Sequence, residues 1–131
     1  MILNLSDLSD EPLQGQIVRQ VRAKILAGEL AADSDLPSIR SLAREQRVSV
    51  ITVQRAYESL VREGLIHSRR GKGFFVSGLD EAMKKSMAIR RLNEKIESLV
   101  SAALAEGLSK QEIESVVTEI LREESGDDKS I

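Results

Sequence analysis

Basic residues are concentrated in the middle of the chain, where they could bind a polyanion. Positions 38–73 hold eight Lys or Arg residues against three acidic ones, a net charge of +5. Positions 79–131 hold eight basic and twelve acidic residues, a net charge of −4, and the whole 131-residue chain carries −2. A basic patch within an acidic chain is typical of a nucleic-acid-binding module joined to a part with another role.

Two short helices and a β-hairpin are predicted to position this charge. The first helix opens at Ser38, whose hydroxyl can cap it, and the second runs from near Ser49 to Gly64, a residue that suits a helix end. The second helix should bury one face, made by Val53, Ala56, Tyr57 and Leu60. Two short helices at a tight turn indicate a helix-turn-helix. The β-compatible runs 65–68 and 74–76 then enclose a cationic tip, which predicts a wing made by Arg69, Arg70, Gly71, Lys72 and Gly73.

The second helix is predicted to lie in the major groove of double-stranded DNA, with its N-terminal residues at base edges. Arg55 could form two hydrogen bonds to guanine and Gln54 two to adenine, whereas Val50 or Ile51 could contact a thymine methyl group. A solvated helix face is the alternative interpretation for Arg44, Arg47 and Arg62, and it is preferred for Arg62. We expect Tyr57 in the core and a structural role for His67.

These motifs, in this order, resemble the GntR family of bacterial transcription regulators. The matching segments are Pro12-Leu13, Gln16-Ile17, Gly28-Glu29-Leu30, Leu36-Pro37-Ser38-Ile39-Arg40, Thr52-Val53-Gln54-Arg55-Ala56-Tyr57, Glu63-Gly64-Leu65-Ile66 and Gly71-Lys72-Gly73-Phe74-Phe75-Val76. The resemblance implies an N-terminal winged helix-turn-helix in which Arg40 and Thr52 anchor the protein on DNA. The chain departs from the family at Arg47, where glycine is usual. A left-handed backbone at that residue would cost about 1 kcal/mol.

The candidate DNA-binding residues come from the second helix, the wing and the resemblance together. They are Ser38, Arg40, Arg44, Ser49, Val50, Ile51, Thr52, Gln54, Arg55, Arg69, Arg70, Gly71, Lys72 and Gly73. The segments before this module are an amphipathic helix that ends at Gly28, and residues 1–11, which fit either a short strand or an extended arm.

After Gly78 the sequence predicts two amphipathic helices, the first over Glu81–Glu106 and the second after a capping box of Ser109 and Glu112. Two helices alone cannot bury both apolar faces, so a second copy of the chain is expected to cover them. The candidate dimerisation residues are Met87, Leu92, Ile96, Leu99, Val100, Ala103, Ile113, Val116, Val117 and Ile120. A short helical pair in this place resembles the YtrA-type branch of the family.

The predicted fold is mainly α with a small β-hairpin, a winged helix-turn-helix followed by a two-helix dimerisation region. We expect the DNA-binding domain over residues 1–77, the dimerisation region over 78–124 and a disordered tail over 125–131.

Composition argues against several other classes of protein. The chain has no Cys and one His, so neither a disulfide framework nor a metal site is predicted, and no cofactor is expected. No apolar run approaches the ~20 residues of a membrane helix, and the acidic N-terminus does not read as a secretory signal, so a cytoplasmic location is expected. About 50 residues follow the wing, too few for a catalytic domain. Gly71-Lys72-Gly73 also lacks the spacing of a phosphate-binding loop, so an enzyme is not predicted.

The predicted function is therefore a sequence-specific regulator, a repressor by analogy with the family, that binds an inverted-repeat operator as a homodimer. The alternative is a winged helix that binds another protein without specific DNA binding, although the +5 patch argues against it. An unidentified small-molecule effector, apolar or cationic, could bind between the C-terminal helices of the dimer.

Overall fold

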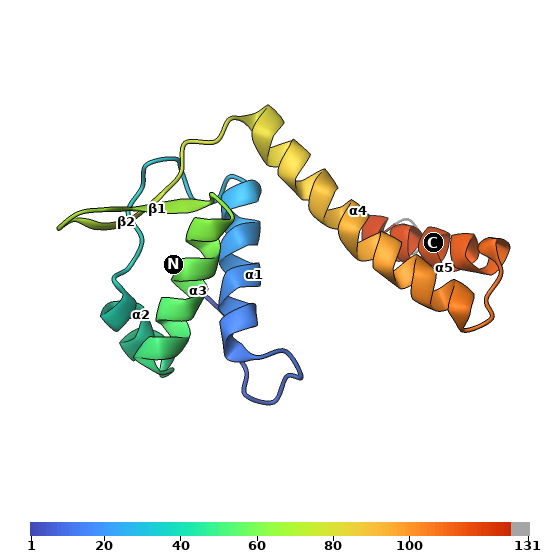
Figure 1. Cartoon of the computed structure of the whole chain (residues 1–131), viewed down its shortest axis with the longest axis horizontal. Helices are drawn as coiled ribbons and strands as arrows, with labels where there is room; N and C mark the ends of the chain where they lie inside the picture. Colours follow the sequence, from blue (N-terminus) through green and yellow to red (C-terminus); the bar gives the residue numbers. More distant parts are fainter. Residues whose placement is uncertain (127–131) are drawn as a thin grey trace. The chain divides into compact units, whose positions relative to one another are not determined.

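The computed structural model describes residues 1–126, which form five helices and one hairpin (Figure 1). The helices are α1 (Leu13–Leu26), α2 (Ile39–Gln46), α3 (Val50–Arg62), α4 (Glu81–Ala105) and α5 (Lys110–Ser125). The strands β1 (Ile66–Arg69) and β2 (Gly73–Val76) pair antiparallel, with Ile66 opposite Val76. The predicted fold, mainly α with a small hairpin, is confirmed. The chain divides into two compact units, one over Met1–Lys85 and a second that begins at Ser86.

The core of the first unit forms where α1 and α2 pack against α3 (Figure 1). The four residues predicted to face inward on α3 are all fully buried: Val53, Ala56, Tyr57 and Leu60. They meet a buried stripe of α1 made by Ile17, Val21 and Ile25, and Leu42 of α2. Apolar side chains at helical spacing therefore fix which side of α3 faces solvent.

Side-chain hydrogen bonds cap the N-termini of α2 and α3, and the turn between the two helices contains one residue with a strained backbone. The Ser38 hydroxyl accepts a hydrogen bond from the Ser41 amide at 3.1 Å, and the Ser49 hydroxyl accepts one from the Thr52 amide at 3.1 Å. Arg47 ends α2 with φ of 57° and ψ of 44°, which is a left-handed backbone. The side chain at this position carries the steric cost that glycine would avoid.

The hairpin is attached to the helices through the loop that precedes α2. The Asp33 amide donates to the Val76 carbonyl and the Leu36 amide to the Phe74 carbonyl, each at 2.9 Å. The Phe74 ring meets the Tyr57 ring edge to face, with 5.0 Å between centroids. The loop thus pairs with one edge of β2, and the inner face of the hairpin packs on α3.

The first residues form an extended arm rather than a strand. Gln16, only 2% exposed, donates to the carbonyls of Ser6 and Glu11 at 2.8 Å and accepts from the Ser6 amide at 2.9 Å. Gln20 makes a similar reciprocal pair with the backbone of Asn4. The two glutamines, one helical turn apart on α1, thereby hold the arm along that helix.

The second unit contains most of α4 and all of α5. The predicted capping box is present, because Ser109 and Glu112 each accept a hydrogen bond from the other's backbone amide. Hydrogen bonds from the backbone amide and then from the side chain of Ser109 lower the pKa of the exposed Glu112 carboxyl. The predicted tail begins at Ser125, which is the last residue of α5, and Gly126 caps the helix; residues 127–131 lie outside the described residues. Among residues 1–126 there is no helix of the length and apolarity needed to cross a bilayer.

Candidate nucleic-acid interface

The N-terminal half of α3 presents an outward face that could contact base edges. Because Val53, Ala56 and Tyr57 point into the core, the residues between them in the helical repeat must point outward. Val50 and Ile51 are 46% and 49% exposed, and Gln54 and Arg55 are exposed as well. The structure therefore brings together on one face the four residues that were predicted to read bases.

The first turn of α3 is suited to bind a phosphate group. The hydroxyls of Ser49 and Thr52 lie 2.8 Å apart, beside the free amides of the helix N-terminus. Those amides and the helix dipole favour an anion there. On α2, Ser38 forms the cap, and the side chains of Arg40 and Arg44 are exposed. These five residues remain predicted DNA-binding residues, with Ser38 and Thr52 predicted to contact phosphate.

The hairpin carries its cations in two different settings. Arg70, Gly71 and Lys72 form the turn, which projects away from the helices of the first unit (Figure 1). Within the described part of the chain, Arg70 and Lys72 are exposed and have no ion-pair partner. Arg69, in contrast, lies in β1 and has partners, the Asp33 carboxylate and the Phe75 ring. The sequence placed Arg69 and Gly73 in the turn, whereas the structure pairs them across the strands.

Tyr57 connects the outward face of α3 to the rest of the module. Its hydroxyl donates to the Pro37 carbonyl at 2.7 Å, directly before the cap of α2. Burial raises the pKa of Tyr57, and the negative charge of Glu45 raises it further. The phenol therefore stays protonated and keeps donating through the neutral pH range.

Sequence reasoning missed supporting groups whose partners are distant in the chain. Arg22 of α1 donates two hydrogen bonds, at 2.8 and 2.9 Å, to the carboxylate of Glu63 at the end of α3. Gln16 holds the arm, and Asp33 holds Arg69. Arg and Glu at positions 22 and 63 carry no local signal of pairing, since 41 residues separate them.

The predicted dimerisation residues lie mostly in exposed apolar stripes. Leu92 and Leu99 of α4 are 58% and 68% exposed, and Ile96 lies between them on the same face. The 3–4 spacing continues to Ile89 and Ala103; Ile89 was not among the predicted residues, although it is 53% exposed. Met87 lies five residues before Leu92, which places it on a different side of α4. Val116, Val117 and Ile120 of α5 are also exposed.

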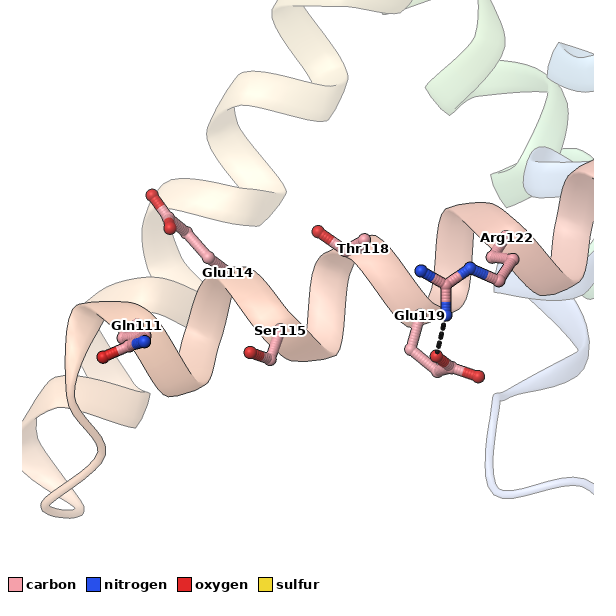
Figure 2. A pocket seen from close by; sticks show the side chains of 6 residues that line it. All are labelled: Gln111, Glu114, Ser115, Thr118, Glu119 and Arg122. Carbon is pink, nitrogen blue, oxygen red and sulfur yellow. Dashed lines mark hydrogen bonds and ion pairs between the residues drawn. The ribbon is translucent and has the colours of Figure 1, made fainter.

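The opposite side of α5 is polar and slightly hollowed. Figure 2 shows the side chains that line the hollow: Gln111, Glu114, Ser115, Thr118, Glu119 and Arg122. Arg122 donates to the Glu119 carboxylate at 2.9 Å. Since all six belong to one helix and none is apolar, the hollow is the solvated face of an amphipathic helix and does not resemble the predicted effector site.

The sequence of this chain is similar to those of known DNA-binding regulators. Residues 13–76 match the family model described as bacterial regulatory proteins, gntR family. The repressor NagR of Bacillus subtilis is 34% identical over 105 residues, which are 80% of this chain and 42% of NagR. The repressor YtrA of Bacillus subtilis is 26% identical over 98% of this chain and 99% of YtrA. The chain thus spans less than half of NagR but nearly all of YtrA.

Solved structures give the same result. YtrA from Sulfolobus acidocaldarius, a GntR-family transcription factor, is 30% identical with a TM-score of 0.56, over 92% of this chain and 97% of that chain. The AraR DNA-binding domain in complex with operator ORX1 is 29% identical with a TM-score of 0.51, over 59% of this chain and 95% of that chain. These relatives are DNA-binding regulators and not enzymes. The chain therefore belongs to the GntR family of bacterial regulatory proteins, in its YtrA-type branch.

Proposed function

We propose that the protein is a repressor that binds an inverted-repeat operator as a homodimer, with α3 in the major groove and the wing on the backbone or in the minor groove. Residues 1–77 would bind DNA and residues 78–124 would dimerise. The observation that carries the proposal is the outward face of α3, where Val50, Ile51, Gln54 and Arg55 are exposed together beside a capped helix N-terminus.

Three similarities support the regulatory part of the proposal. NagR and YtrA of Bacillus subtilis are both named as transcriptional repressors. The AraR DNA-binding domain, which is similar to 59% of this chain, is bound to an operator in its structure. A regulator of this kind would act in the cytoplasm, where chromosomal DNA is accessible.

The exposed stripes of α4 and α5 support the homodimer. Leu92 and Leu99 of α4, and Val116 and Ile120 of α5, are each more than half exposed, so each helix presents an apolar stripe to solvent. Because about half of each side chain is still exposed, burying the remainder would contribute roughly 1–2 kcal/mol per residue. A second copy with the same stripes is the simplest cover, because a two-fold interface pairs identical surfaces.

Affinity for a selected duplex tests base reading by α3. Wild-type protein would first recover a preferred duplex from a random pool, and binding would then be measured by fluorescence anisotropy. We expect Arg55→Ala to reduce discrimination between the selected duplex and a variant with one changed base pair by about 1–3 kcal/mol. Arg62→Ala is the matched control, because Arg62 lies on the same helix and donates to Ser59 at 2.9 Å. Equal effects of the two substitutions would contradict base reading by Arg55.

Sedimentation equilibrium tests the dimer. We expect wild-type protein to be dimeric at micromolar concentration and Leu92→Lys/Leu99→Lys to be monomeric, because two charges would enter the apolar interface. Leu8→Lys is the matched control, since Leu8 is 96% exposed in the N-terminal arm and outside the stripes. A dimer that survives the double substitution would contradict the proposed interface.

The effector remains a prediction of the sequence. A ligand held between the C-terminal helices would raise the melting temperature of the dimer and change its affinity for DNA in the same titration. Compounds that leave both quantities unchanged at saturating concentration would be excluded as effectors.

A further inference from the structure

We propose that Arg69 positions the wing and does not bind DNA. The proposal rests on the DNA-binding function proposed above and assigns a different task to one of the wing's three cations. Arg70 and Lys72, which are exposed at the turn, would be the cations that contact the nucleic acid.

The side chain of Arg69 crosses the outer face of the hairpin. It starts in β1, opposite Gly73, on the same face as His67 and Phe75, which pair with each other across the strands. Its guanidinium carbon lies 4.4 Å from the centroid of the Phe75 ring, and its Nη2 lies 3.4 Å from Oδ1 of Asp33. The His67 ring stacks on the Phe75 ring, with 6.1 Å between centroids.

Asp33 is a fixed partner because its own backbone is bound to β2. Its φ is 64°, in the left-handed region, and its amide donates to the Val76 carbonyl at 2.9 Å. Arg69 therefore links three neighbouring segments: it belongs to β1, covers Phe75 of β2 and reaches the loop on the far edge of β2. Of the side-chain hydrogen bonds and ion pairs within residues 1–126, this is the one that joins the hairpin to another segment.

These contacts compete with a phosphate contact. A phosphate bound to the guanidinium would share its donors with the Asp33 carboxylate, 3.4 Å away, and the negative charge of that carboxylate would oppose a second anion beside it. The side chains of this ion pair are exposed, at 47% for Arg69 and 68% for Asp33, so the pair contributes little to the stability of the fold. Its effect on DNA binding would come from the orientation that it gives to the turn at residues 70–72.

Salt-dependent anisotropy with the full chain and the selected duplex separates positioning from contact. The variants are Arg69→Gln, Asp33→Asn, the two combined, and Arg70→Gln as the matched control. Asparagine suits position 33 because it tolerates a left-handed backbone. We expect Arg69→Gln and Asp33→Asn each to weaken binding by roughly threefold to tenfold, with no further loss in the double variant. The salt slope should stay unchanged in these variants and fall by about 0.9 in Arg70→Gln.

The result that would overturn the proposal is a salt slope lowered by about 0.9 in Arg69→Gln together with tighter binding by Asp33→Asn. Melting temperatures of all variants would verify that they fold. Backbone order parameters of residues 70–72 give a second readout that needs no DNA, and we expect them to fall in both single variants. If wild-type protein bound no duplex selectively, the proposed function would fail, and unchanged order parameters in the variants would separately refute the role of Arg69.

Discussion

Removing the hydroxyl of Tyr57 should lower the free energy of unfolding of the DNA-binding module, because one hydrogen bond is lost. Tyr57→Phe keeps the edge-to-face contact with Phe74 but deletes the donor to the Pro37 carbonyl, 2.7 Å away. The net loss of a hydrogen bond and the unpaired carbonyl left behind together cost about 1–2 kcal/mol. For a unit of this size, that corresponds to a fall of roughly 4–16 °C in melting temperature at neutral pH.

The pH dependence gives the same prediction a second test. Burial raises the pKa of Tyr57 in the folded state, whereas the unfolded chain ionises near pH 10. The unfolded state therefore loses the phenolic proton first, and the stabilisation present below about pH 10 declines by about 1.4 kcal/mol for each pH unit above it. The advantage of wild-type protein over Tyr57→Phe should disappear near pH ~11.

Chemical denaturation followed by far-ultraviolet circular dichroism, at equal protein concentration, measures the difference between the two proteins. Tyr57 is the only tyrosine of the chain, so tyrosinate absorbance reports its ionisation directly. Stability curves of the two proteins that run parallel from neutral to strongly alkaline pH would refute the reasoning, as would ionisation of native Tyr57 near pH ~10.

Two further substitutions test the supports of the module. Arg47→Gly should stabilise the protein by up to about 1 kcal/mol in the same denaturation assay, because glycine removes the left-handed strain but adds freedom to the unfolded chain; a loss of stability would mean that the Arg47 side chain makes a contact that matters. Gln16→Ala should destabilise by about 1–3 kcal/mol, because two carbonyls and one amide of the arm lose their partner. Hydrogen exchange should show the Ser6 amide losing protection, and retained protection there would contradict the role given to Gln16.

Local sequence signals were sufficient for most of the first unit. The caps at Ser38 and Ser49 and the buried face of α3 follow from residue type and helical spacing. The same holds for the capping box at Ser109. Each of these features is decided within a few residues of chain, so periodicity and capping preferences are enough to predict it.

Contacts between distant segments could not be predicted in this way. Nothing near Asp33 or Arg69 in the sequence indicates that they pair across 36 residues, and the strand boundaries that separate Arg69 from the turn depend on the register of the hairpin. Gln16 was matched as part of a family motif, but its three hydrogen bonds depend on where the arm lies. The sequence left open whether that arm was a strand, and the glutamines of α1 explain why it is extended.

On α4, the sequence predicted the apolar stripe but not all of its residues correctly. Apolar residues occur on more than one side of this helix, so Met87 was included and Ile89 omitted, although the 3–4 spacing from Leu92 to Ala103 continues to Ile89. An amphipathic sequence indicates that the helix has an apolar face. Which residues belong to that face is known only when the position of each side chain around the helix axis is known.

Hydroxyl-radical footprinting of wild-type protein on the selected duplex tests the central claim most directly. A dimer that places one α3 in each half-site should protect two symmetric patches about 10 bp apart, or a multiple of one helical turn, and duplexes cut to one half-site should bind far more weakly. A single unrepeated patch, bound equally well by the half-site duplex, would contradict a dimeric regulator of an inverted-repeat operator.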